Sequence, residues 1–266
     1  MAAPSAFRLA ERKYKFYKKP PHDADYSDVV DFSHIQDNNE SMKEAISCKE
    51  VHLGDRTLQI CSLRGVDGFL FIPQALTIEE QAHWAHRSIS EYPQPPNFSN
   101  FGGMLADNVW SSHLESDESI TDPKARINKL RWVTLAYHYN WSTNIYENTP
   151  ERISEFPPEL VELCNKHATI SGIESYEPQA GIVNFYHGNV SMMKAHQDES
   201  EFTFDKPIFS YSMGARCIFL LGRASTDIEP IPIWMNSGDL MIMGGHSRVF
   251  YHGAMSNLLL YYVNCS

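Results

Sequence analysis

Short apolar stretches separated by turn signals dominate the second half of the chain. β-branched and aromatic residues are concentrated in seven of them, at 130–139, 180–187, 207–213, 216–222, 231–235, 239–245 and 247–253. Turn-forming residues such as Asn236, Ser237 and Gly238 separate these stretches at short intervals. Short strands without intervening helices predict an antiparallel sandwich or barrel, such as a jelly roll, the double-stranded β-helix. The expected fold class is therefore mainly β with flanking helices (α+β).

Two helical patterns lie outside this series of strands. Thr77 and Glu80 have the spacing of a capping box at the start of the amphipathic stretch 78–92. A second helix is predicted to start at the Pro157-Pro158 pair and to continue through "ELVELCNKHA".

Length and charge allow several classes of protein. A chain of 266 residues can form one large domain or two small ones. The formal net charge of −11 argues against a generally basic nucleic-acid coat. Residues 1–20 are the exception, because they hold six basic side chains and one acidic one. This segment is consistent with a mitochondrial presequence, a phosphate-contacting arm or a solvated tail.

The cysteines and the hydropathy restrict the cellular setting. Five widely spaced cysteines without a Cys-x-x-Cys pair suggest neither a disulfide framework nor a cysteine zinc site, so a reducing compartment is expected. The chain contains no run of about 18 apolar residues, so no membrane span is expected. The first residues also lack the apolar core of a signal peptide.

A candidate metal site starts at His196 and Asp198. If these residues lie in a strand, their side chains point to the same face and can reach one ion. Two histidines and a carboxylate are the ligands of non-heme Fe(II) oxygenases. Downstream of Asp198 the chain contains only His246 and His252. We expect His252 to be the third ligand, because it ends a predicted strand, whereas His246 lies in the turn before it.

Several motifs together resemble one known family. The stretches are "GIVNFYH", "HQDESE", "PIFSYSMGARCIFLLG" and "MNSGDLMIMGGHSRVFYHGA". They are similar to the core of the AlkB-type Fe(II)/2-oxoglutarate-dependent nucleic-acid dioxygenases, and most of all to the branch of the first mammalian AlkB homologue. The resemblance covers roughly residues 5–254. It implies a basic N-terminal extension over 1–35, a helical and loop region with a nucleotide-recognition lid over 36–129, and a jelly-roll core over 130–254.

The resemblance also assigns roles to individual residues. It makes His196, Asp198 and His252 both the iron ligands and the catalytic centre, and Asn184 and Tyr186 the residues that hydrogen-bond 2-oxoglutarate. Aromatic side chains near the site are expected to hold a flipped-out base, with Glu199 and Glu201 accepting hydrogen bonds from it. The expected substrate-binding residues are Trp132, Tyr137, Tyr139, Trp141 and Glu201. The alternative reading is sheet packing for the aromatic residues and solvated acids for the two glutamates.

The chain departs from the family after Ala254. The family has two arginines six positions apart there, the first of which binds the distal carboxylate of 2-oxoglutarate. Here the last residues read "MSNLLLYYVNCS", without Lys or Arg. We therefore expect residues 255–266 to be a non-family tail that replaces or lacks the final strand. Arg216, Arg223 and Arg248, on or beside core strands, are possible substitutes for the missing cation.

Three functions remain open. The first is oxidative demethylation of N-methylated bases in tRNA or DNA, with Fe(II), 2-oxoglutarate and O2, impaired by the missing arginines. The second is a truncated binding or regulatory isoform without catalysis. The third is a zinc hydrolase that uses the same ligands. The resemblance implies a nucleic-acid partner, no membrane, a monomer, and a mitochondrial or nuclear location. The methylated base is left open.

Overall fold

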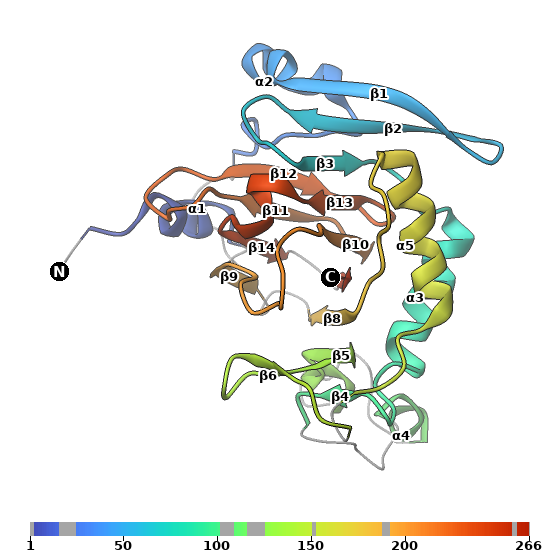
Figure 1. Cartoon of the computed structure of the whole chain (residues 1–266). Helices are drawn as coiled ribbons and strands as arrows, with labels where there is room; N and C mark the ends of the chain where they lie inside the picture. The colour runs from blue at the N-terminus through green and yellow to red at the C-terminus, as the bar shows by residue number, and fades with distance from the viewer. Residues whose placement is uncertain are drawn as a thin grey trace.

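Two antiparallel sheets form the centre of the molecule. The computed structural model describes residues 3–15, 25–101, 109–115, 126–150, 153–187, 192–256 and 260–265, with only the backbone for 112–113, 256 and 260–265. In the larger sheet the central strands lie in the order β13 (Leu240–Met243), β10 (Ile208–Gly214), β15 (Leu260–Cys265) and β8 (Ala180–Tyr186). The smaller sheet has the order β12 (Ile231–Met235), β11 (Cys217–Leu221), β14 (His252–Ser256) and β9 (Met192–His196). From β8 to β15 each strand lies in the other sheet from the strand before it, except that β11 and β12 form a hairpin within the smaller sheet. The predicted jelly roll is therefore confirmed (Figure 1).

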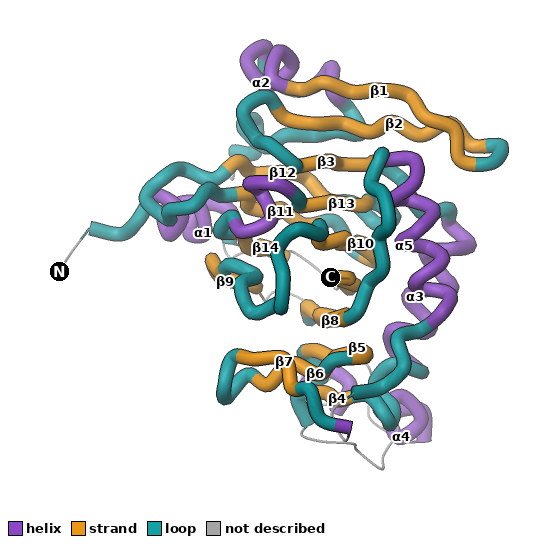
Figure 2. The backbone as a smooth tube through the Cα atoms, viewed as in Figure 1, coloured by secondary structure: helices purple, strands orange, loops and turns teal. Residues whose placement is uncertain are grey.

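The larger sheet continues beyond the jelly roll on both sides. Strands β1 (Ile46–Leu53), β2 (Arg56–Leu63) and β3 (Phe69–Ile72) extend it past β13. Strands β5 (Trp132–Ala136) and β4 (Phe98–Ser99) extend it past β8. A separate hairpin, β6 (His138–Asn140) and β7 (Ile145–Glu147), lies below β5 (Figure 2). The stretch 60–72 predicts short strands around a turn at Asp67 and Gly68, in agreement with β2 and β3. Strands β1 and β4 were not expected in this region of helices and loops.

Helices cover the outer face of the larger sheet. α3 (Ile78–Ser90) and α5 (Pro158–Ser171) lie side by side along it, whereas α4 (Val109–Glu115) and α2 (Glu40–Ala45) lie at opposite ends of the molecule (Figure 1). The capping box of Thr77 and Glu80 is confirmed, and α5 ends at Gly172 with φ of 74°. None of the described helices is long and apolar enough to cross a bilayer.

A buried histidine of α5 makes the stability of the fold depend on pH. His167 is buried, and its Nδ1 lies 3.0 Å from the hydroxyl of Tyr211. Burial lowers the pKa of His167 to about 4. Because this folded-state pKa lies below the unfolded value, stability present at neutral pH is lost as the pH falls from about 6.5 towards about 4. Between pH 7 and about pH 4.5 the free energy of unfolding should fall by about 2 kcal/mol more in the parent than in His167→Gln. Urea titrations at both pH values measure this, and equal losses in the two proteins would contradict it.

Residues 247–253 differ from the predicted strand. A 3₁₀ turn spans Gly245–Val249, and β14 begins rather than ends at His252. The turn is held from outside the segment, since the backbone N–H of Ser247 donates to the carbonyl of Asp67 at 3.1 Å. The apolar run alone did not reveal this long-range contact.

The end of the chain also forms a strand. β15 pairs with β10 on one side and with β8 on the other, so the place of the final jelly-roll strand is filled. The final jelly-roll strand was expected to be either replaced or missing, and β15 replaces it. The register sets position 262 opposite Asn184 and position 260 opposite Tyr186. The sequence has tyrosine and leucine there, not a cation.

The prediction that the chain has no disulfide is wrong. Cys48 on β1 and Cys61 on β2 are directly paired and joined by a disulfide bond. Cys164 and Cys217 are free and buried. The pair was missed because two cysteines 13 positions apart become neighbours only when the β1–β2 hairpin sets their register.

Part of the basic N-terminal segment is packed against the core. α1 (Ala6–Tyr14) lies against the smaller sheet, and Phe7, Ala10 and Tyr14 are buried on it. Residues 6–14 are therefore not a solvated tail. The i, i+3, i+7 spacing of these apolar positions predicts an amphipathic helix. An interpretation from the charges alone missed this helix.

Candidate metal centre and cosubstrate cavity

Three predicted ligands meet where β9 and β14 pair. His196 ends β9, His252 begins β14, and the two residues are direct partners in the ladder. Asp198 lies two residues beyond the end of β9, in the loop to β10, rather than within a strand as expected. Among the residues that the structure describes, these three form the one group of side chains close enough to hold a metal ion, with ligand atoms within 4.8 Å of one another.

The ring orientations of both histidines suit metal binding. Nδ1 of His196 lies 3.0 Å from the carbonyl of Lys194, and Nδ1 of His252 lies 3.0 Å from the carbonyl of Phe250. A carbonyl can only accept, so Nδ1 carries the proton in each neutral ring and the lone pair is on Nε2. The Nε2 atoms of His196 and His252 lie 3.7 and 3.4 Å from the Asp198 carboxylate. The three donors thus converge, as a borderline divalent metal requires.

The charges of the triad favour an ionised carboxylate. Burial acts to raise the pKa of Asp198, but the adjacent His252, together with His196 and Arg248, holds it well below its ordinary value. Burial and the neighbouring His252 lower the pKa of His196. Burial also acts to lower the pKa of His252, yet the Asp198 carboxylate outweighs it and raises that pKa. The arrangement offers one negative ligand and at least one neutral imidazole.

Arg248 holds the loop that carries Asp198. Its side chain is fully buried and donates from Nη1 to the Asp198 carbonyl at 2.8 Å and from Nε to the Lys206 carbonyl at 3.1 Å. Nη2 pairs with the Glu201 carboxylate at 3.0 Å. These contacts span both ends of the loop between β9 and β10, so Arg248 fixes the loop backbone beside the triad.

The two predicted cosubstrate residues share one face of β8. Asn184 lines the same cavity as His196 and Asp198. Tyr186 is buried in the interior between the two sheets, where its hydroxyl donates to Sδ of Met193 at 3.4 Å. Burial raises the pKa of Tyr186 well above its ordinary value, so its hydroxyl stays protonated. An amide and a neutral phenol can both donate to a carboxylate.

A cavity of about 780 Å³ opens in front of the triad. Tyr139, Trp141 and Tyr146 from the β6–β7 hairpin line one side, and residues 192–201 line the other. The hairpin is joined to the loop after Asp198, because the Tyr139 hydroxyl lies 3.4 Å from Oγ of Ser200. The volume lies within the usual range for a small-molecule site.

The other predicted substrate residues lie further from the triad. Trp132 stacks behind Trp141 with ring centroids 3.7 Å apart, so it supports the cavity wall. Tyr137 lines a neighbouring hollow of about 310 Å³ and contacts the ring of Phe202. Glu201 lines both cavities, but it is already paired with Arg248 and accepts from the Tyr146 hydroxyl at 3.4 Å. Glu199 is exposed at the rim of the cavity.

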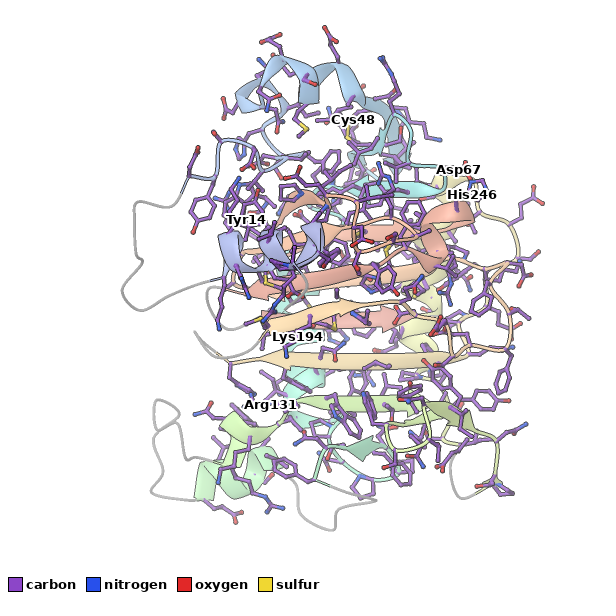
Figure 3. The ribbon with its side chains drawn as sticks, turned by 90° about the vertical axis from the view of Figure 1, so that its left-hand side faces the viewer. Tyr14, Cys48, Asp67, Arg131, Lys194 and His246 are labelled. Atoms are coloured by element: carbon purple, nitrogen blue, oxygen red, sulfur yellow. A yellow bond between two sulfur atoms is a disulfide. The ribbon has the colours of Figure 1, made fainter. Side chains whose placement is uncertain are left out.

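The proposed substitute cations are engaged elsewhere. The guanidinium of Arg216 lies 3.6 Å from the ring centroid of Trp234, and that of Arg223 lies against Phe250. Arg248 is committed to the loop contacts described above. Within the described ranges, Lys194 on β9 is the cation that lines the metal cavity, and its side chain is exposed (Figure 3). Sequence reasoning missed it, although its position two residues before His196 was a signal.

His246 belongs to a different region. It lies in the 3₁₀ turn, its side chain is 85% exposed, and its Nδ1 is 3.2 Å from Oδ2 of Asp67. Both residues, which are labelled in Figure 3, line a wide hollow of about 1160 Å³ formed by β3, β13 and this turn. The choice of His252 over His246 therefore agrees with the geometry.

Comparisons with known proteins agree with this site. Residues 68–258 match the 2OG-Fe(II) oxygenase superfamily. The DNA N(6)-methyladenine demethylase ALKBH1A of Arabidopsis thaliana is 31% identical over 94% of this chain and 83% of the relative. The nucleic acid dioxygenase ALKBH1 of Homo sapiens is 33% identical over 93% and 68%. The tRNA demethylase abh1 of Schizosaccharomyces pombe is 28% identical over 95% and 85%.

Proposed function

Because this chain belongs to the 2OG-Fe(II) oxygenase superfamily, and within it to the ALKBH1 group, we propose that it oxidatively demethylates N-methylated bases in tRNA or DNA. The family implies Fe(II), 2-oxoglutarate and O2 as cofactor and cosubstrates. The observation that supports the proposal best is the cluster of His196, Asp198 and His252, of which the first two line a cavity walled by aromatic side chains. Bound iron would activate O2, which is the oxidant. One oxygen atom would enter the succinate that forms with CO2 from 2-oxoglutarate, and the other would hydroxylate the methyl group, whose carbon would then leave as formaldehyde.

The residues of the chain hold and orient the reactants. His196 and His252 would bind the metal through Nε2, and Asp198 through its carboxylate. Asn184 and Tyr186 would donate to the carboxylate oxygens of 2-oxoglutarate. The Tyr139 and Trp141 rings would stack on the flipped base, and each stacked base contributes roughly 1–3 kcal/mol. That contribution is comparable with the few kcal/mol needed to extract a base from its helix.

A nucleic-acid substrate is proposed from two sources. The names of the relatives specify DNA, tRNA or nucleic acid. The aromatic wall and the rim carboxylate of Glu199 suit a methylated, cationic base. The chain would act as a monomer in mitochondria or the nucleus.

A binding or regulatory role without catalysis is the second candidate. The observation that favours it is the register of β15, which places leucine and tyrosine opposite Tyr186 and Asn184. In this reading the chain keeps the fold and the metal ligands but holds 2-oxoglutarate poorly.

Succinate release separates the two candidates. The chain is incubated with Fe(II), 2-oxoglutarate and methylated DNA or tRNA oligonucleotides, and succinate and formaldehyde are quantified. Equal amounts of both products, absent with Asp198→Ala, support the demethylase. Metal binding without succinate from any oligonucleotide supports the non-catalytic role.

A further inference from the structure

The N-terminal helix reaches the strand that carries a metal ligand. Phe7 and Tyr14 of α1 lie in one apolar cluster with Ile218 of β11 and Met255 of β14, and Ala195 of β9 packs against that cluster. In Figure 3, α1 with Tyr14 lies next to β9 with Lys194. The helix is thus anchored on the same sheet that supplies His196 and His252.

The buried face of α1 contains an acidic residue. Glu11 is only 3% exposed, and its Oε1 accepts the backbone N–H of Ala195 at 2.8 Å. Its other oxygen pairs with the Arg8 guanidinium, which lies one helical turn earlier. A carboxylate is costly to bury unless its oxygens are satisfied, and here a guanidinium and a backbone amide satisfy them.

The Ala195 N–H, which donates to Glu11, lies at a break in the β9–β14 ladder. His252 pairs with His196, but Ala254 pairs with Met193, so β9 has one residue more than β14 between these pairs. Gly253 faces this bulge, and a Cβ there would lie 2.7 Å from the Met193 carbonyl. A bulge leaves a residue outside the regular ladder and redirects the next side chain. The residue after the bulge is His196.

We propose that Glu11 is a positioning residue for the metal centre. It accepts the Ala195 N–H from outside the sheet, fixes the bulge, and thereby sets the direction in which the His196 imidazole leaves the strand. The two hydrogen-bonded residues are 184 positions apart in the sequence. The metal centre then depends on α1, and loss of this helix would weaken metal binding as well as the fold. This inference rests on the proposed assignment of His196 as a ligand.

The test is Mn(II) affinity, followed by the EPR signal of free Mn(II). Glu11→Ala should weaken Mn(II) binding about tenfold, at the lower end of what loss of a supporting contact costs. Glu11→Gln keeps an acceptor oxygen and should restore affinity to near the parent value. Tyr14→Phe is the matched control, because it removes the 2.6 Å hydrogen bond from α1 to Asp28 without touching β9. It should lower the melting temperature but leave Mn(II) affinity unchanged.

Each other outcome is decisive as well. Parent-like affinity in Glu11→Ala overturns the proposal, and so does an equal loss in Tyr14→Phe, which would show that helix docking alone matters. If Glu11→Ala does not fold, Glu11→Asp takes its place, because the shorter side chain keeps the charge but cannot reach Ala195. Parent-like affinity in that variant overturns the proposal, and a tenfold loss supports it. Failure of the parent to bind Mn(II) would instead contradict the ligand assignment.

Discussion

Replacing Asp198 or His252 with alanine is expected to abolish stoichiometric binding of Fe(II), or of Mn(II) as its redox-inactive substitute. The reason is geometric, because Asp198 lies between the two imidazoles, 3.7 Å from Nε2 of His196 and 3.4 Å from Nε2 of His252. Removing either residue leaves only two of the three donors. Equilibrium dialysis with metal analysis measures the effect.

His246→Ala is the matched control for this experiment. His246 is the other histidine downstream of Asp198, but it is exposed and lies beside Asp67. Metal stoichiometry should stay that of the parent. Loss of metal in His246→Ala with retention in His252→Ala would mean that the third ligand is wrongly assigned.

The second large effect concerns 2-oxoglutarate. The 266-residue chain should bind it weakly, because no described cation besides Lys194 lines the metal cavity and residues 253–266 contain neither Lys nor Arg. A bidentate contact between arginine and carboxylate contributes on the order of 1.5–3 kcal/mol. Its absence corresponds to roughly 10–100-fold lower affinity. A calorimetric titration of the Mn(II)-loaded chain with 2-oxoglutarate measures this affinity.

A chimera provides the comparison. Replacing residues 257–266 with a family segment that has the paired arginines leaves β14 whole and should restore affinity and succinate release. The same segment with methionine at both arginine positions is the control and should not restore them. Tight binding by the parent would contradict the prediction, and its loss in Lys194→Met would then identify Lys194 as the cation used.

The local sequence determined the elements and the chemistry of the site. Period-two alternation on β8 placed Asn184 and Tyr186 on one face, and the capping box set the start of α3. These features depend on interactions between residues only a few positions apart in the sequence. The His-x-Asp spacing was a weaker signal, because its argument placed both residues in one strand, whereas Asp198 lies in the loop beyond β9. The order of strands and turns also sufficed to predict the jelly roll.

Only the tertiary structure decided which distant residues meet. The β9–β14 register set His252 opposite His196, and the β1–β2 register set Cys48 opposite Cys61, its disulfide partner. Register is set by contacts over the whole sheet, and no short window of sequence contains it. Arg248, in the 3₁₀ turn before β14, donates to the carbonyl of Asp198. The sequence alone had suggested it only as a substitute for the missing arginine. The hydrogen bond between Glu11 and the Ala195 N–H joins residues 184 positions apart, so it forms only when the whole chain has folded. The buried carboxylate of Glu11 needs this bond, and no nearby stretch of sequence predicts it.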